Sequence, residues 1–87
     1  MLTARHQEDL DAVVSAITAD GGSAIGVVAD SADPAAPKEV FAKAIEAFGQ
    51  VDLRVTNAGY GDMASIEEPT DEHFEMEIQI NYAGVFR

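Results

Sequence analysis

The segment Val51–Gly59, which reads VDLRVTNAG, decides the fold that we expect for this chain. We expect residues 51–56 to form a short strand, and the three small residues that follow to open a loop that reaches Pro69. An apolar stripe with helical spacing precedes the segment and ends at Gly49; it consists of Val40, Phe41, Ala44, Ile45 and Phe48. A helix that leads directly into a buried strand indicates an α/β fold.

The residues on the amino-terminal side repeat this alternation. Apolar residues at helical spacing predict a helix that Asp20-Gly21-Gly22 ends, because glycine adopts the left-handed cap conformation easily; they are Leu10, Val13, Val14 and Ile17. The run Ala24–Ala29 then predicts a short strand covered on both faces. The next helix has two possible starts: Pro34, with Asp33 as its cap, or Pro37, with Ala36 as a poor cap.

The carboxyl-terminal part predicts a third helix. Thr70-Asp71-Glu72 opens it with a capping residue and acidic side chains near its positive end. Phe74, Ile78 and Val85 lie along one face of this helix, and Asn81 falls on the same face. Helices and strands in this order predict βαβ units and a parallel sheet.

Length and composition predict one small domain that covers residues 1–87, without a second domain. The net charge of −11 opposes binding to nucleic acid, whose phosphates are also negative. No apolar run is long enough to predict a membrane span, and the chain has no cysteine, which fits a cytoplasmic location. His6 and His73 are far apart and have no ligand spacing, so no metal site is expected.

Several blocks resemble, in order and spacing, the short-chain dehydrogenase/reductase family. The segment that ends in Thr56-Asn57-Ala58-Gly59 is similar to the family's fourth strand, where Asn-Asn-Ala-Gly is typical. The other similar blocks are Ala4-Arg5 after the second strand, Val28-Ala29-Asp30 at the third strand, Phe48–Asp52 before the fourth strand, and Ile80–Phe86 in the helix that carries an Asn followed by Gly-Val-Phe.

The resemblance implies a partial Rossmann fold that binds NAD(P), about βαβαβα, with a parallel sheet that lacks its first strand. It implies an internal fragment of an oxidoreductase that transfers hydride between a nicotinamide cofactor and a carbonyl or alcohol substrate. The family's Gly-rich turn and its catalytic Ser, Tyr and Lys have no counterpart here: Ala64 lies four residues after Tyr60, and Phe86 four after Tyr82. We therefore expect the chain alone to be inactive. The alternative is a non-catalytic remnant that interacts with a full-length relative through exposed strand edges.

The resemblance also implies a cofactor site. Arg5 occupies the position where a basic residue often faces the 2′-phosphate, which favours NADP over NAD; the alternative is an ordinary surface arginine. Asp30 matches the acid that accepts a hydrogen bond from the adenine amino group, with the backbone of Ser31 beside it; the alternative is an aspartate that caps a turn.

Asn57, Ala58 and Gly59 match the block that lines the adenosine and ribose region, where small side chains let a cofactor approach and glycine permits a turn. Asn81 matches the catalytic Asn of the family, whose backbone and a bound water assist proton relay. Residues 59–64 also fit a G-x-G-x-x-A dinucleotide pattern, but Pro69 leaves too little room for the helix that this pattern requires.

Two features bear on stability and assembly. Arg54 stands where the family's buried strand carries Leu or Ile, and burying an unpaired guanidinium is costly. The strand at residues 51–56 would have no neighbour without the first strand, so we expect the isolated chain not to fold stably as a monomer. The resemblance implies a homo-oligomer that acts on a small molecule, and the sequence does not identify that substrate.

Overall fold

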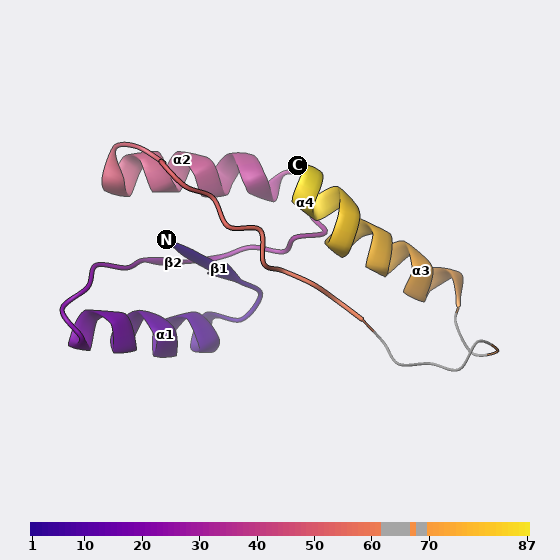
Figure 1. The fold of residues 1–87 in the computed structure, drawn as a ribbon, viewed down its shortest axis with the longest axis horizontal. Coiled ribbons are helices and arrows are strands. Elements are labelled where there is room, and N and C mark those ends of the chain that lie inside the picture. Colours follow the sequence, from indigo (N-terminus) through magenta and orange to yellow (C-terminus); the bar gives the residue numbers. More distant parts are fainter. Residues whose placement is uncertain (62–66, 68–69) are drawn as a thin grey trace.

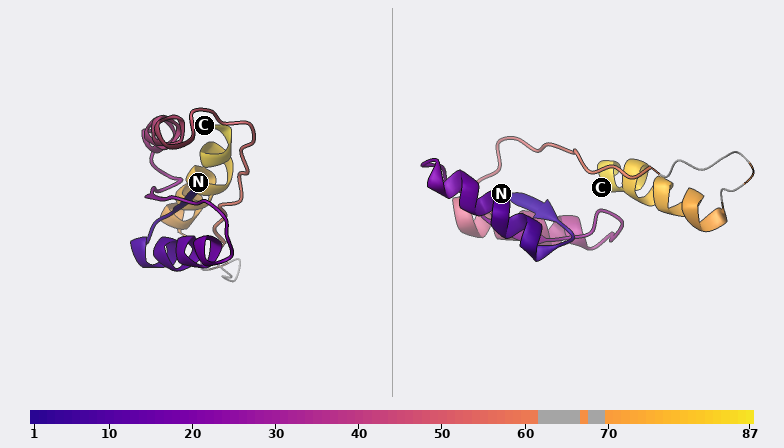
Figure 2. Two further views of the ribbon diagram at one scale, coloured as in Figure 1. Left: turned by 90° about the vertical axis from the view of Figure 1, so that its left-hand side faces the viewer. Right: turned by 90° about the horizontal axis from the view of Figure 1, so that it is seen from below.

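A computed structural model of the chain describes residues 1–61, 67 and 70–87, and within them three layers are stacked (Figures 1 and 2). A two-stranded sheet lies between helix α1 on one side and helix α2 on the other, and a helical arm formed by the last residues extends away from these layers. The radius of gyration is 15.3 Å, whereas a compact domain of this length has about 12 Å. The molecule is therefore elongated, and the arm accounts for its length.

The sheet consists of strands β1 (Leu2–Ala4) and β2 (Gly26–Val28), which run parallel. Leu2 is aligned with Gly26, and Ala4 with Val28. Backbone bonds of 2.9 Å from Leu2 N to Ile25 O and from Ala29 N to Ala4 O continue the pairing at both ends. The strand predicted at residues 24–29 is confirmed, with a shorter paired core.

Helix α1 (Gln7–Ala19) connects the two strands and covers one face of the sheet. Leu10 is its buried residue and is only 3% exposed. A Cβ added to Gly26 would lie 2.9 Å from Leu10 Cβ, so the helix lies directly on β2 at this glycine. The helix ends as predicted, because Asp20 closes its last turn and Gly21 adopts a φ of 87°.

Helix α2 (Ala36–Phe48) covers the opposite face and resolves the open question of where it begins. Its cap is Ala35, so Pro37 is the second helical residue, where its missing N–H costs no helical hydrogen bond. Asp33 lies before the helix and accepts a bond from Ala35 N through Oδ1 at 2.9 Å. Gly49 ends the helix with a φ of 81°, as predicted.

The arm is a continuous helical rod made of α3 (Asp71–Glu77), the π-helix η1 (Ile78–Ala83) and α4 (Gly84–Phe86). The predicted start is confirmed: Thr70 is the cap, and its hydroxyl accepts a bond from His73 N at 3.3 Å. A π-helical turn requires N–H groups to bond five residues back, as Gly84 N does to Gln79 O. Neither the apolar stripe nor the sequence motif predicts this turn.

The strand predicted at residues 51–56 is wrong, because residues 50–61 form neither strand nor helix. They run as an extended segment from α2 toward the arm (Figure 1), and Leu53 and Val55 are 80% and 77% exposed. A strand is defined by hydrogen bonds to a neighbour, and no other described strand lies beside this segment. Arg54 is exposed as well, so the expected penalty for a buried guanidinium does not arise here. The second half of the rejected G-x-G-x-x-A pattern lies outside the described residues.

The core is small for a chain in which 47% of residues are apolar. The buried apolar residues among those described are Leu10, Val27, Ala36, Ala44 and Ile80. Large apolar side chains are exposed on α2, on the extended segment and on the arm; they include Phe41, Phe48, Leu53, Phe74 and Phe86. In the described part of the chain, no helix combines the length and apolar character that a membrane crossing needs.

Candidate functional site

The carboxyl ends of β1 and β2 lie at the same edge of the sheet. Ala4 is paired with Val28, so Arg5 and Asp30 both leave the sheet at this edge, and both side chains are exposed. In open parallel α/β sheets, ligands bind outside the carboxyl ends of the strands. The structure therefore brings two of the predicted cofactor residues, one cationic and one anionic, to the edge at which ligands bind in such sheets.

The loop after β2 is a compact turn organised by Asp30. Its Oδ1 accepts a bond from Ala32 N at 2.9 Å, and its backbone carbonyl accepts one from Asp33 N at 3.0 Å. The turn-capping alternative is therefore present, but it occupies one carboxylate oxygen and leaves the other without a partner among the described residues. Ser31 lies at the tip of this turn and is half-buried.

Asn81 is bound to the backbone of the loop that follows residues 57–59. Its Oδ1 accepts a bond from Tyr60 N, and its Nδ2 donates one to Tyr60 O, both at 2.7 Å. The side-chain amide thus pairs with one residue as a neighbouring strand would, across 21 positions of sequence. Sequence reasoning singled out Asn81 but missed Tyr60, because its partner atoms belong to the backbone.

Asn57, Ala58 and Gly59 are all exposed and lie in the extended segment just before this contact. The argument that Gly59 permits a turn was wrong, since the described glycines with positive φ are Gly21 and Gly49. A Cβ at Gly59 would instead lie 3.6 Å from Asn81 Oδ1, which is an ordinary contact distance. Neither a positive φ nor a lack of space therefore requires glycine at this position.

The helical arm also reaches the loop after β2. Gly84 lies against Ser31, and Arg87 donates through Nη1 to Ala32 O at 3.5 Å. The C-terminus accordingly lies beside the start of α2 in Figure 1. Sequence reasoning gave no role to Gly84 or Arg87, although Gly-Val-Phe after the Asn was part of the family resemblance. One arm thus contacts both loops that carry predicted cofactor residues.

The resolved pKa shift in the described chain concerns Glu72, outside this edge. The Glu72 backbone N–H, followed by the Thr70 hydroxyl, lowers the pKa of this exposed carboxyl, and His73 adds a smaller effect in the same direction. These groups stabilise the ionised form at the start of α3. Glu72 therefore serves the helix terminus rather than the candidate site.

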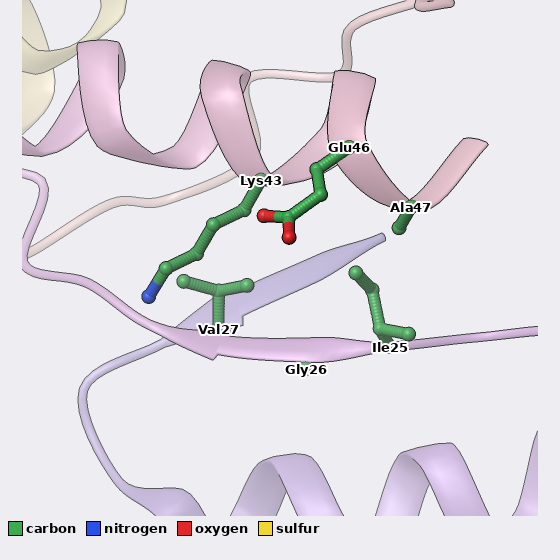
Figure 3. A pocket seen from close by; sticks show the side chains of 6 residues that line it. All are labelled: Ile25, Gly26, Val27, Lys43, Glu46 and Ala47. Atoms are coloured by element: carbon green, nitrogen blue, oxygen red, sulfur yellow. The ribbon is translucent and has the colours of Figure 1, made fainter. Parts of the chain in front are cut away.

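A separate cavity of about 520 Å³ lies between β2 and α2 (Figure 3). Lys43 and Glu46 extend from α2 toward Val27 on β2 and Ile25 just before it, and Gly26 and Ala47 complete the lining. The cavity lies over β2 rather than past its carboxyl end, and it includes no predicted site residue. Among the described residues, no group of three or more His, Asp or Glu could hold a metal ion.

A model of the family described as "short chain dehydrogenase" matches residues 1–87. The chain belongs to the short-chain dehydrogenase family. An uncharacterized oxidoreductase of Methylorubrum extorquens is 43% identical over 75 residues, which are 86% of this chain and 30% of that protein. Versicolorin reductase 1 of Aspergillus parasiticus is 32% identical over 83 residues, or 95% of this chain and 32% of the relative.

Solved dehydrogenase structures superpose on nearly the whole of this chain. One from Burkholderia cenocepacia, in complex with NADP, superposes with a TM-score of 0.89 at 35% identity, over 97% of this chain and 35% of that one. An alcohol dehydrogenase from Thermococcus sibiricus, complexed with 5-hydroxy-NADP, gives 0.89 at 30% identity, over 98% of this chain and 37% of its own. The predicted family and the partial Rossmann fold are confirmed, and the chain spans about a third of the length of these relatives.

Proposed function

We propose that the protein containing this segment is an NAD(P)-dependent oxidoreductase that transfers hydride between a nicotinamide cofactor and a carbonyl or alcohol substrate. The observation that carries this proposal is the shared edge at which Arg5 and Asp30 leave adjacent parallel strands in a member of the short-chain dehydrogenase family. The cofactor would supply the hydride, and these residues would bind and orient its adenosine half.

The residues present fit such a cofactor chemically. The guanidinium of Arg5 suits a 2′-phosphate, the free oxygen of Asp30 suits an adenine amino group, and the turn at Ser31 offers backbone groups next to it. The exposed and small residues Asn57, Ala58 and Gly59 allow close approach of the ribose. In our proposal Asn81 assists catalysis from the arm through its backbone and a bound water, while its side-chain amide is bonded to Tyr60.

We favour NADP over NAD. The support is Arg5 after β1, preceded by Ala4 where an NAD-preferring site would place an acid. Relatives occur with both cofactors in their names: the Burkholderia cenocepacia structure contains NADP, whereas an uncharacterized relative from Mycobacterium tuberculosis is called NAD-dependent. Cofactor preference is therefore a separate test from cofactor binding.

The experiment is a titration of the full-length protein with NADP⁺ and NAD⁺, followed by NADPH oxidation with a panel of ketones and aldehydes. Arg5→Ala should raise the dissociation constant for NADP⁺ by about 10- to 100-fold, the effect of losing charge-assisted hydrogen bonds. Its affinity for NAD⁺ should stay within about twofold, because NAD has no 2′-phosphate. A full-length protein that binds neither cofactor contradicts the proposal.

For the 87 residues alone we propose no catalysis, because the family's Ser, Tyr and Lys have no counterpart in them. We further propose a cytoplasmic homo-oligomer that binds neither nucleic acid nor membranes. The net charge of −11 supports the absence of nucleic-acid binding, because phosphates are also negative. The alternative of a non-catalytic module rests on the open edge of β1 and predicts co-purification with a full-length relative. The similarity to oxidoreductases across nearly the whole chain favours the enzyme.

A further inference from the structure

Gly84 has a conformation that does not require glycine. Its φ and ψ of −63° and −33° are those of an ordinary helix, which any residue adopts. Glycine weakens a helix relative to alanine, because it loses more backbone freedom on folding. A reason for glycine at this position must therefore come from its surroundings.

The surroundings supply that reason. A Cβ added to Gly84 would lie 2.6 Å from the backbone oxygen of Ser31 and 3.3 Å from Ser31 Cβ. Distances below 3.0 Å essentially never occur for a real Cβ, so the loop after β2 and the arm would have to move apart. The obstacle is backbone rather than a flexible side chain, and the displacement would therefore shift the whole tip of the turn.

Arg87 holds the same loop one turn further along the arm. Its Nη1 donates to Ala32 O at 3.5 Å, and its Nη2 donates to Gln79 Oε1 at 3.3 Å, which fixes the guanidinium to its own helix. The bonds within the turn, from Ala32 N to Asp30 Oδ1 and from Asp33 N to Asp30 O, set its internal shape. They do not set where the turn lies relative to the arm.

We infer that Gly84 and Arg87 are positioning residues: they place the turn Asp30–Ala32 and thereby set the affinity for the adenine half of the cofactor. This inference rests on the proposed function. Neither residue touches the cofactor in it; each acts through the turn. A shift of the turn moves the Asp30 carboxylate and the Ser31 backbone together, so adenine loses its partners while the rest of the cofactor site is unchanged.

The test is made in the full-length protein with Gly84→Ala, Arg87→Met and Arg87→Lys. Dissociation constants are measured for NADP⁺, and for its two halves through adenosine monophosphate and nicotinamide mononucleotide. Gly84→Ala should weaken NADP⁺ and adenosine monophosphate by about fivefold to tenfold, the loss of one or two hydrogen bonds. Nicotinamide mononucleotide should bind as in the wild type, and Arg87→Lys should recover part of the affinity that Arg87→Met loses.

The matched control is Glu75→Gln on the exposed side of α3, which should leave all three constants unchanged. Wild-type affinity for adenosine monophosphate in both Gly84→Ala and Arg87→Met overturns the inference, as does an equal loss for the two halves, which indicates general disruption. If Gly84→Ala does not fold, the affinity of Arg87→Met for adenosine monophosphate tests the inference by itself. The Arg87 side chain is exposed, so it can be replaced without a change in the core. A wild type that binds neither NADP⁺ nor NAD⁺ defeats the proposed function itself, which is a different result.

Discussion

Replacing Asn81 by alanine should release the loop at Tyr60 from the helical arm. The substitution removes both 2.7 Å bonds between the side-chain amide and the Tyr60 backbone. A neutral hydrogen bond contributes about 1 kcal/mol net, and water can replace part of it here because Asn81 is exposed. We therefore expect a loss of about 1–2 kcal/mol in the free energy that keeps this contact closed.

The assay is amide hydrogen exchange of the full-length protein, read at Tyr60. A loss of that size raises the population of the open loop, and with it the exchange rate, by about 5- to 30-fold. Asn81→Asp should retain protection at neutral pH, because its carboxylate still accepts from Tyr60 N, but it loses the donor to Tyr60 O.

The matched control is Gln7→Ala. It removes a hydrogen bond of similar length within one helix, the bond of 2.8 Å that the side-chain amide of Gln7 donates through Nε2 to Asp11 Oδ1. It should cost about 0.5 kcal/mol or less and leave Tyr60 exchange unchanged. If Tyr60 exchanges equally fast in Asn81→Ala and the wild type, the side-chain amide does not hold this loop, and the reasoning is refuted.

Three further outcomes follow from the structure. In denaturant unfolding of the full-length protein, Gly26→Ala should lower the free energy of unfolding by about 1–3 kcal/mol, because its Cβ would lie 2.9 Å from Leu10 Cβ. An unchanged free energy of unfolding contradicts the close contact. The lowered pKa of Glu72 should stabilise the folded state above the carboxyl's unfolded pKa, and this stabilisation disappears as pH falls through the folded value. Wild type should therefore melt higher than Glu72→Gln at pH 7 but not at strongly acidic pH, and a gap that persists in acid rules out the carboxylate as its cause. The isolated chain, at micromolar concentration, should show no cooperative thermal transition by circular dichroism, whereas a sharp transition would mean that its small core suffices.

The helices could be predicted from the sequence because their signals are local. An apolar stripe ending at Gly49, and Thr70 before two acids, each lie within a few residues of the element that they define. The prediction of a strand at residues 51–56 failed for the opposite reason. The composition of this segment is that of a strand, but pairing depends on a neighbour elsewhere in the chain.

Some features of the candidate site could likewise be predicted from the sequence, and others could not. The shared edge of Arg5 and Asp30 follows from parallel strands and is predictable once the fold class is known. The contacts that Asn81 and Gly84 make are not predictable, because one joins residues 21 positions apart and the other depends on where a turn meets a helix. Gly59 shows the limit of residue-type rules, since neither its φ nor a close contact requires glycine there.

The π-helical turn Ile78–Ala83 absorbs an additional residue within the arm. Because a π-turn holds about one residue more than an α-helical turn, a one-residue deletion there converts it to α-helix and leaves the residues beyond it facing as before. The same deletion in α3 rotates everything beyond it by about 100°, and Gly84 and Arg87 then face away from the turn after β2. The arm therefore tolerates the loss of one residue within Ile78–Ala83, but not within Asp71–Glu77, without losing its contact with that turn.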